Sequence, residues 1–210
     1  MKIAILGATG KTGLYAMLHS LAAGNEVRVL ARDPSKIITK HDKLTVLKGD
    51  ATNVADCAKL VEGCDSVIAA VGPQGLGATT VRQDIARALV AAMTEKGVKR
   101  VVWLSAFGVG ESMDQMRRST FIGSRIFVPL LLKKTYIDAL AADEVLKSSG
   151  LDYVLARPPQ LTNAKSQREL VAIPADEKVP RLRCTRTDVA QWMRKAATSG
   201  AFDRQAPVIC

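Results

Sequence analysis

The glycines near the start of this sequence have the spacing of a phosphate-binding turn. Gly7, Gly10 and Gly13 lie three residues apart in the stretch MKIAILGATGKTG. Gly7 lets the chain turn sharply off a strand, Gly10 lets the backbone approach a pyrophosphate, and Gly13 lets a helix pack closely on the sheet. The N-terminus of that helix offers unpaired N–H groups and a positive dipole end to a phosphate. Further donors and one charge come from Thr9, Lys11 and Thr12.

Two other interpretations of this turn have to be weighed. The nucleoside-triphosphate loop G-x-x-x-x-G-K-[ST] would need a glycine at position 5, which is Ile5, inside the first strand. A glycine-rich connection that binds no ligand is the second interpretation, since the spacing is G-x-x-G-x-x-G rather than G-x-G-x-x-G. The place of the turn, between a strand over residues 2–6 and the first helix of an alternating chain, favours a dinucleotide site.

A basic residue at the end of the second strand predicts which dinucleotide binds. Residues 26–31 (EVRVLA) alternate like a strand, and Arg32 follows directly. An arginine there suits the 2′-phosphate of NADP(H), whereas an NAD site places an acid there for the ribose hydroxyl. Asp33 precedes Pro34 and is better interpreted as the N-cap of a short helix. We therefore predict NADP(H), with a solvated surface role for Arg32 as the alternative. The nearby donors are Ser35 and Lys36.

The third and fourth strands end in further candidate residues. Asp50 follows a short strand over residues 44–47, and its carboxylate can accept from the adenine amino group or cap a helix over residues 53–62. Residues 66–71 form a continuous apolar run, which is typical of a central parallel strand, and they lead into Gly72. We expect both strand ends to lie along the path of the cofactor.

Ser105 is the candidate for the reacting end of the cofactor. It ends the fifth expected strand, residues 100–105 (RVVWLS), and ligands of doubly wound sheets bind at the carboxyl edge. We place Ser105 beside the nicotinamide, with a serine that only forms a turn as the alternative. The sixth expected strand, residues 151–156, ends at the same edge. The residues that it delivers to the cofactor are Pro158, Gln160 and Leu161.

The order of these elements predicts the fold class. Strands and helices alternate, which indicates a Rossmann-type, doubly wound α/β fold with a mainly parallel sheet, in a single domain over residues 1–210. We expect residues 108–134 to form an irregular flap over the substrate or to carry extra helices, with a partner or membrane patch as the alternative. The remaining expected elements are helices over 79–96 and 135–149, peripheral strands over 169–173 and 179–183, a last helix to Ser199 capped by Thr187 or Asp188, and an edge strand over 208–209.

Composition limits the class of protein and its partners. Thirty lysines and arginines against twenty acids give a net charge of +10, which favours a phosphorylated cofactor and an acidic substrate. The basic residues are scattered and aromatic residues are few, so we expect no nucleic-acid partner. The apolar run over residues 126–132 is too short to span a bilayer. The four cysteines form no C-x-x-C pair, so we expect neither zinc nor a structural disulfide, and a cytoplasmic location.

The tyrosine–lysine pair that donates a proton in short-chain dehydrogenases is missing. The residues four positions after Tyr15, Tyr136 and Tyr153 are His19, Leu140 and Arg157. A hydride acceptor that needs no strong protein acid, such as free flavin, a quinone or an extended tetrapyrrole, avoids this difficulty. The protein would then act mainly by orienting two flat rings face to face. We therefore expect a conjugated, anionic small molecule as the acceptor.

The order of motifs along nearly the whole chain resembles that of the atypical short-chain dehydrogenases. The matching motifs are GATGKTG, ARDPSK, KGD, LSAF, and SGLDY followed by RPPQL. Within that group the chain is similar to the flavin reductase/biliverdin-IXβ reductase family and, more distantly, to NmrA-like proteins. The resemblance implies NADPH-dependent reduction of flavins or biliverdin-like tetrapyrroles, with Ser105 as the active-site serine. The cofactor residues that it implies are Gly7, Thr9, Gly10, Lys11, Thr12, Arg32, Ser35, Lys36, Asp50, Ala51, Val71, Gly72 and Arg82.

The chain departs from that family at positions that bear on the acceptor. Ala139 and Gln160 stand where the biliverdin reductase pattern has histidine, and residues 111–134 are longer than in that pattern. We therefore predict reduction of flavin or quinone ahead of biliverdin. A non-catalytic, NADP-binding redox sensor of the NmrA-like kind is the second hypothesis. A sugar-nucleotide epimerase or dehydratase is the third, and the missing tyrosine disfavours it.

Overall fold

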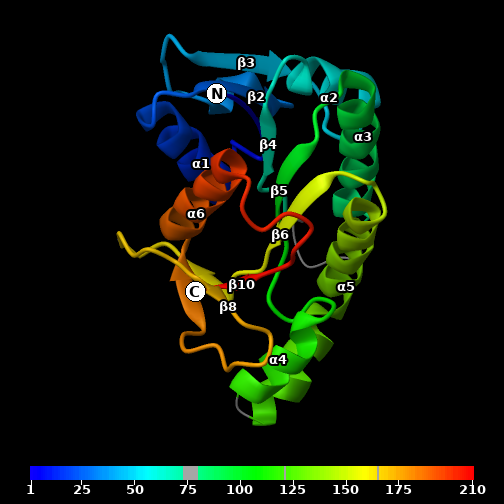
Figure 1. Ribbon diagram of the computed structural model, residues 1–210, viewed down its shortest axis with the longest axis vertical. Coiled ribbons are helices and arrows are strands. Elements are labelled where there is room, and N and C mark those ends of the chain that lie inside the picture. The colour runs from blue at the N-terminus through cyan, green and yellow to red at the C-terminus, as the bar shows by residue number, and fades with distance from the viewer. Residues whose placement is uncertain (73–79, 121, 165) are drawn as a thin grey trace.

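A six-stranded parallel sheet forms the centre of the molecule (Figure 1). The computed structural model describes residues 1–72, 80–120, 122–164 and 166–210, and over residues 122–133 it describes the backbone alone. The strands lie in the order β3-β2-β1-β4-β5-β6. Their bounds are β1 (Lys2–Leu6), β2 (Glu26–Ala31), β3 (Leu44–Lys48), β4 (Ser66–Ala69), β5 (Arg100–Leu104) and β6 (Asp152–Ala156).

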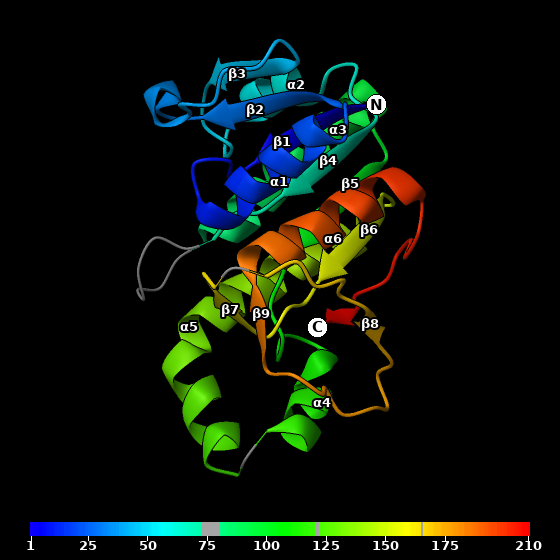
Figure 2. The ribbon, with the colours of Figure 1, turned by 90° about the vertical axis from the view of Figure 1, so that its left-hand side faces the viewer.

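Helices cover both faces of this sheet (Figures 1 and 2). One face carries α1 (Lys11–Ala22) and α6 (Arg186–Ser199), and the other carries α2 (Val54–Val61), α3 (Val81–Lys96) and α5 (Ile122–Lys147). Successive residues of β1 point to opposite faces, so Ile3 and Ile5 pack with the first layer of helices, while Ala4 and Leu6 pack with the second. Burial on both faces explains why the strands are continuous apolar runs.

The strand order reverses at β1, which places a crevice at one edge of the sheet. Leu6 at the end of β1 pairs with Leu30 of β2 on one side and with Ala69 of β4 on the other. Ligands of doubly wound sheets bind outside the carboxyl ends of the strands at such a reversal. The residues that the parallel strands bring to this edge include the turn over 7–13, Arg32, Asp50, Gly72 and Ser105. The predicted Rossmann-type fold is therefore confirmed.

The bounds of several elements differ from the expected ones. β4 ends at Ala69, two residues earlier than expected. The last helix is capped by Thr185, whose hydroxyl accepts from the N–H of Asp188 at 3.2 Å, so the expected caps Thr187 and Asp188 were wrong and both residues lie inside the first turn. The short helix after β2 (η1, Pro34–Lys36) is capped by Asp33 as predicted.

The segment over residues 108–134 carries extra helices, which was one of the two expected alternatives, rather than following an irregular path. Its role as a flap over the substrate stays a prediction. It contains α4 (Ser112–Ser119) and the first half of α5, which begins 13 residues before the helix that we expected from residue 135. The helix continues through Pro129, although proline removes a backbone donor from a helix. In Figure 2, α4 and the start of α5 lie at the opposite end of the molecule from β3.

Short strands close the C-terminal part of the chain. β8 (Ala172–Ile173) pairs with β10 (Val208–Ile209) in antiparallel fashion, and β9 (Arg183–Thr185) pairs in parallel with β7 (Gln160–Thr162). The peripheral strands expected over 169–173 and 179–183 are thus shorter or shifted, and β7 was not expected. In the described part of the chain, no helix has both the length and the apolar content needed to cross a bilayer.

Candidate cofactor and active site

The glycine turn after β1 is too crowded for side chains at two of its three glycines. Gly7 has a φ of +85°, and a Cβ there would lie 2.4 Å from the carbonyl oxygen of Ala70. A Cβ on Gly13 would lie 2.1 Å from the carbonyl oxygen of Gly7. The structure therefore confirms the sharp turn at Gly7 and the close packing of α1 on the strand at Gly13.

The N-terminus of α1 is open, as an anion site requires. Gly10 occupies the N-cap position, offers no capping side chain, and donates its own N–H to the carbonyl of Gly7 at 2.9 Å. Among the described residues, the N–H groups of residues 11–13 have no hydrogen-bond partner, and the first turn contains no acidic residue. Thr9 and Lys11 are exposed, whereas Thr12 is buried. These features fit the pyrophosphate of a dinucleotide.

The polar residues after β2 engage one another and not Arg32. Asp33 accepts from the N–H of Ser35 at 3.2 Å and from its hydroxyl at 2.6 Å. The hydroxyl hydrogen bond is the first cause that lowers the pKa of Asp33, and the backbone hydrogen bond is the second. Lys36 lies 4.0 Å from the Asp33 carboxylate. Arg32 is exposed and has no hydrogen-bond or ion-pair partner among the described residues.

Asp50 does not cap α2, so that alternative was wrong. Asn53 caps the helix by accepting from the N–H of Asp56 at 3.1 Å. Asp50 instead accepts from the N–H and the hydroxyl of Thr52, both at 2.9 Å, and the backbone hydrogen bond is the main cause that lowers its pKa. The adjacent Ala51 is half-buried. The interaction of Asp50 with an adenine amino group stays a prediction.

Arg82 supplies a buried cation near the end of β4. Among the described residues, its Nε and Nη1 atoms are buried without a hydrogen-bond partner, and burial lowers its pKa. A Cβ on Gly72 would lie 3.8 Å from its Nη2, which places the guanidinium beside the chain that leaves β4. Val71 is half-buried next to Gly72, and residues 73–75, expected to continue this glycine-rich turn, lie outside the described residues.

A buried carboxylate on α5 completes the surroundings of Arg82. Asp138, 3% exposed, accepts from the backbone N–H groups of Arg82 and Gln83 at 3.2 and 3.1 Å. It therefore caps the N-terminus of α3 from a different helix. Nε and Nη1 of Arg82 could bind an anionic group, and a cofactor contact of this residue, which the family resemblance implies, stays a prediction.

A buried chain of polar side chains joins Ser105 to α5. The Ser105 hydroxyl donates to Oδ2 of Asp143 at 2.8 Å, and Nη2 of Arg157 donates to the same oxygen at 3.1 Å. The three residues are 6%, 0% and 1% exposed, respectively. Burial raises the pKa of Asp143, while the charge of Arg157 and the hydrogen bond from Ser105 act in the opposite direction. The network holds Ser105 in one orientation.

The outer end of this network reaches the surface at Glu111. Nη1 of Arg157 donates to Oε2 of Glu111 at 2.8 Å, and Nζ of Lys147 pairs with the same carboxylate. Burial alone would raise the pKa of Glu111, but the hydrogen bonds from Lys147 and Arg157 outweigh it and lower the pKa to about 2. Arg157 therefore shares its charge between one buried and one exposed carboxylate.

Sequence reasoning missed Asp143 and Arg157 as parts of the site. Arg157 directly follows β6, and the rule that placed Ser105 at a strand end applies to it equally. Asp143 lies on α5 among the buried residues Ala139, Ala142 and Leu146. The available signal was the presence of acids, Asp143 and also Asp138, on an otherwise apolar helix face, because charged residues are seldom fully buried without a partner.

The residues that follow β6 lie at the same edge as Ser105. Pro158 is buried, and its carbonyl accepts from the N–H of Phe107 at 3.1 Å. Gln160 is exposed, and its side-chain oxygen accepts from Nε of Arg183 at 3.1 Å. Leu161 is half-buried within β7. Their contact with a cofactor stays a prediction.

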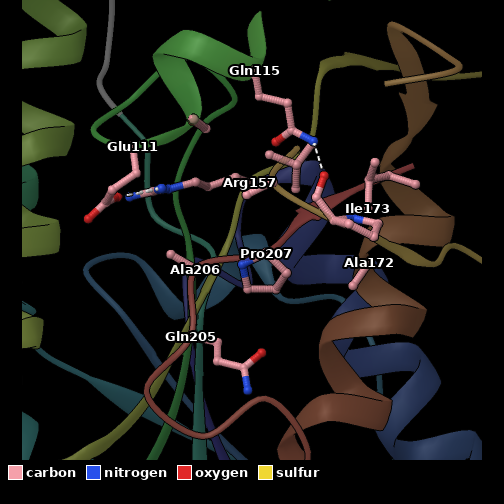
Figure 3. Close-up of a pocket in the computed structure, with 12 residues that line it drawn as sticks. Glu111, Gln115, Arg157, Ala172, Ile173, Gln205, Ala206 and Pro207 are labelled. Atoms are coloured by element: carbon pink, nitrogen blue, oxygen red, sulfur yellow. Dashed lines mark hydrogen bonds and ion pairs between the residues drawn. The ribbon is translucent and has the colours of Figure 1, made fainter. Parts of the chain in front are cut away.

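Arg157 also lines a cavity of about 350 Å³ (Figure 3). Its walls come from the start of α4, from the segment around β8 and from the segment over residues 205–208. Gln115 closes one side by donating from its amide to the carbonyl of Pro174 at 2.8 Å. Ser105 does not line this cavity, so it is distinct from the edge where the glycine turn and Ser105 lie.

The parallel sheet, the glycine turn and the open terminus of α1 define an NAD(P)-binding protein with a Rossmann fold. Residues 7–199 match the model of a protein family described as NAD(P)H-binding. The chain belongs to this family, and it is an NAD(P)H-binding protein. This agrees with the resemblance to the short-chain dehydrogenase group.

Several known proteins are similar to this chain. An uncharacterised chloroplastic protein of Arabidopsis thaliana is 31% identical over 185 residues, which cover 83% of this chain and 64% of that protein. The chain thus spans just under two thirds of that relative. An uncharacterised sugar epimerase, YhfK, of Bacillus subtilis is 26% identical over 217 residues, which cover 97% of this chain and 93% of that protein.

Solved structures share the fold over the whole chain. The anaerobilin reductase ChuY of Escherichia coli O157:H7 superposes with a TM-score of 0.83 at 18% identity, covering 100% of this chain and 96% of that one. A wide-type short-chain dehydrogenase/reductase of Veillonella parvula, in complex with NADP, gives a TM-score of 0.79 at 19% identity, with 99% and 93% covered. At these identities the likeness concerns the fold.

Proposed function

We propose that this protein is an NADPH-dependent reductase that passes hydride to a flat, conjugated acceptor: a free flavin, a quinone or a biliverdin-like tetrapyrrole. The observation that carries the proposal is the position of Ser105. It lies buried at the end of β5, on the same sheet edge as the open N-terminus of α1. Two structural neighbours, the anaerobilin reductase ChuY and the NADP complex of a short-chain dehydrogenase/reductase, support this proposal.

The residues around the glycine turn would hold the cofactor from its adenosine end. Arg32 is exposed and free to bind the 2′-phosphate, because the neighbouring acid, Asp33, is engaged with Ser35. The N–H groups at the start of α1 would bind the pyrophosphate. The unpaired guanidinium atoms of Arg82 add positive charge between this turn and Ser105. When bound, the cofactor supplies a hydride from its nicotinamide.

Among the described side chains, none is a strong acid placed to protonate the acceptor, and this limits which acceptors suit the site. Tyr136 is the tyrosine of α5, and its hydroxyl donates to the carbonyl of Phe107 at 3.1 Å. Burial raises the pKa of Tyr136, which makes it a poorer proton donor. An acceptor that takes up its proton from water therefore suits this site, and the contribution of the protein is to orient two rings.

The replacement of Arg32 by alanine tests the choice of cofactor. Loss of a hydrogen bond to a charged group is expected to weaken NADPH binding by about 1.5–3 kcal/mol, roughly 10- to 150-fold in the dissociation constant, and to leave NADH binding nearly unchanged. Titration calorimetry with both cofactors measures this difference. Arg117→Ala, at an exposed arginine of α4, serves as the control for loss of one positive charge. Equal weakening of NADPH and NADH would refute the 2′-phosphate assignment.

The replacement of Ser105 by alanine tests the reaction itself. NADPH oxidation is followed with FMN, riboflavin, menadione and biliverdin, and the proposal fails if the wild-type protein turns over none of them. With an active acceptor, Ser105→Ala is expected to lower kcat at least about tenfold, which corresponds to ~1.4 kcal/mol of barrier, while the affinity for NADPH stays within about threefold. An unchanged kcat would show that Ser105 only forms the turn and takes no part in the reaction.

A redox sensor that binds NADP without turnover is the second candidate. The engagement of Tyr136 with a backbone carbonyl, in place of a tyrosine–lysine pair, favours it. Such a sensor must distinguish the two redox forms, so comparing the dissociation constants of NADP⁺ and NADPH decides between the candidates. We also propose a reducing compartment such as the cytoplasm, because all four cysteines are free and buried.

A further inference from the structure

The hydroxyl hydrogen of Ser105 is already committed to Asp143. Ser105 Oγ lies 2.8 Å from Oδ2 of Asp143, and the backbone N–H of Ser105 donates to the carbonyl of Ala156 at 2.8 Å. The side chains of Ser105 and Asp143 are 6% and 0% exposed, so water does not compete for this hydrogen bond. The hydroxyl hydrogen therefore points to Asp143 and is not available to a ligand.

The direction of this hydrogen bond follows from the second donor on the same oxygen. Nη2 of Arg157 donates to Oδ2 of Asp143 at 3.1 Å, and a guanidinium can only donate. Asp143 is the ion-pair partner of Arg157, and an ionised carboxylate can only accept hydrogen bonds. Ser105 must be the donor in the pair.

The consequence is that Ser105 presents lone pairs rather than a hydrogen to a bound molecule. A serine beside a reacting carbonyl ordinarily donates to the carbonyl oxygen. Here we infer that Asp143 is a positioning residue that fixes Ser105 as a hydrogen-bond acceptor, so that the site favours hydride acceptors carrying a ring N–H over quinones. This inference rests on the proposed function and narrows its substrate class.

The three candidate acceptors differ in the group that they can offer to Ser105. An isoalloxazine ring carries an imide N–H, and an open-chain tetrapyrrole carries lactam and pyrrole N–H groups. A simple quinone such as menadione has carbonyl oxygens and no N–H. A serine that can only accept gains a hydrogen bond from the first two and faces a carbonyl lone pair in the third, which leaves a polar pair unsatisfied.

Two substitutions at Asp143 distinguish the effect of losing the hydrogen-bond acceptor of Ser105 from the effect of losing the negative charge. Asp143→Leu removes the acceptor and frees the Ser105 hydroxyl to donate. Asp143→Asn keeps a carbonyl oxygen that can accept from both Arg157 and Ser105. Asp143→Ala replaces the leucine variant if the latter does not fold, which thermal unfolding shows. Asp114→Asn, at an exposed acid of α4, is the control for loss of one carboxylate.

The experiment compares FMN, biliverdin and menadione by turnover and by binding. The affinity for each oxidised acceptor is measured calorimetrically with NADP⁺ present, where no turnover is possible. Relative to wild type, Asp143→Leu is expected to shift both kcat/KM and affinity toward menadione by about three- to tenfold, the value of one neutral hydrogen bond, while Asp143→Asn keeps the wild-type preference. The measurements with FMN and biliverdin show which of the two hydride acceptors that carry an N–H group binds.

The outcomes distinguish this inference from the proposed function. A wild-type protein that turns over none of the three acceptors removes the proposed function, and the inference with it. A wild-type protein that turns over FMN or biliverdin, together with a folded Asp143→Leu variant of unchanged preference, overturns the inference alone. A shift of the same size in both Asp143→Leu and Asp143→Asn also overturns it, because the carboxylate charge would then be responsible.

Discussion

Replacing Gly13 with alanine is expected to displace the start of α1 and to abolish tight cofactor binding. The new Cβ would lie 2.1 Å from the carbonyl oxygen of Gly7 and 2.8 Å from the N–H nitrogen of Ala8, both rigid backbone atoms. Relief of this overlap must move α1 off β1, and overpacking of this kind costs about 1–3 kcal/mol of stability. The N–H groups of residues 11–13 move with the helix, so NADPH affinity should fall at least about tenfold.

Urea unfolding and NADPH titration measure the two effects, and Gly24→Ala is the matched control. Gly24 follows the other end of the same helix with a φ of +80°, and no atom lies within 4 Å of a Cβ built there. That variant should lose stability through backbone strain alone and keep its affinity for NADPH. Wild-type affinity in a folded Gly13→Ala protein would contradict the role of this helix terminus in cofactor binding.

Replacing Arg157 with methionine is expected to be the most destabilising change in the site. Arg157 is 1% exposed and is the ion-pair partner of Asp143, which is 0% exposed. Removal of one member of a buried pair leaves an uncompensated charge and costs about 3–5 kcal/mol. The double variant Arg157→Met/Asp143→Leu removes both members and should recover most of this loss. Urea unfolding of the wild-type protein and the two variants at pH 7 measures the difference.

The pH dependence of the Arg157→Met variant provides a second test. Burial already raises the pKa of Asp143 in the folded protein, and without Arg157 this pKa should rise further, with Lys147 and Arg82 as the remaining cations that face the carboxyl group. An acid whose pKa is higher in the folded state stabilises the protein below its unfolded pKa, and this stability is lost as the pH rises through the folded pKa. The variant should therefore be more stable at pH 5 than at pH 8. If Arg157→Met lowers the free energy of unfolding by less than about 1 kcal/mol at pH 7, the proposed role of the Arg157–Asp143 pair in stability is contradicted.

The fold could be predicted from the sequence because its strands are local, continuous apolar runs separated by glycines. β1 and β2 have the expected bounds, and Gly97, with a φ of +70°, ends α3 where expected. The start of α5 could not be predicted, because Pro129 argues against a helix locally. Ala142 and Leu146, which pack α5 against α3 and the sheet, lie in the half of the helix that the sequence predicted.

The cofactor edge of the site was likewise more predictable than its interior. The glycine spacing indicated the turn over residues 7–13, and the ends of single strands indicated Arg32 and Ser105. Each of these predictions needed only one local segment. The network of Ser105, Asp143 and Arg157 depends on three segments that are 38 and 14 residues apart in the chain. Its members meet because β5 and β6 are neighbours and α5 crosses their ends, so the contact exists in the folded protein alone.

A crystal structure of the protein with NADP⁺ tests the central claim most directly, since the claim concerns where each end of the cofactor lies. We predict the adenosine 2′-phosphate against Arg32, the pyrophosphate at the N-terminus of α1 and the nicotinamide at Ser105. A cofactor bound in the opposite direction, or bound away from the glycine turn, would contradict the proposed site and the chemistry assigned to it.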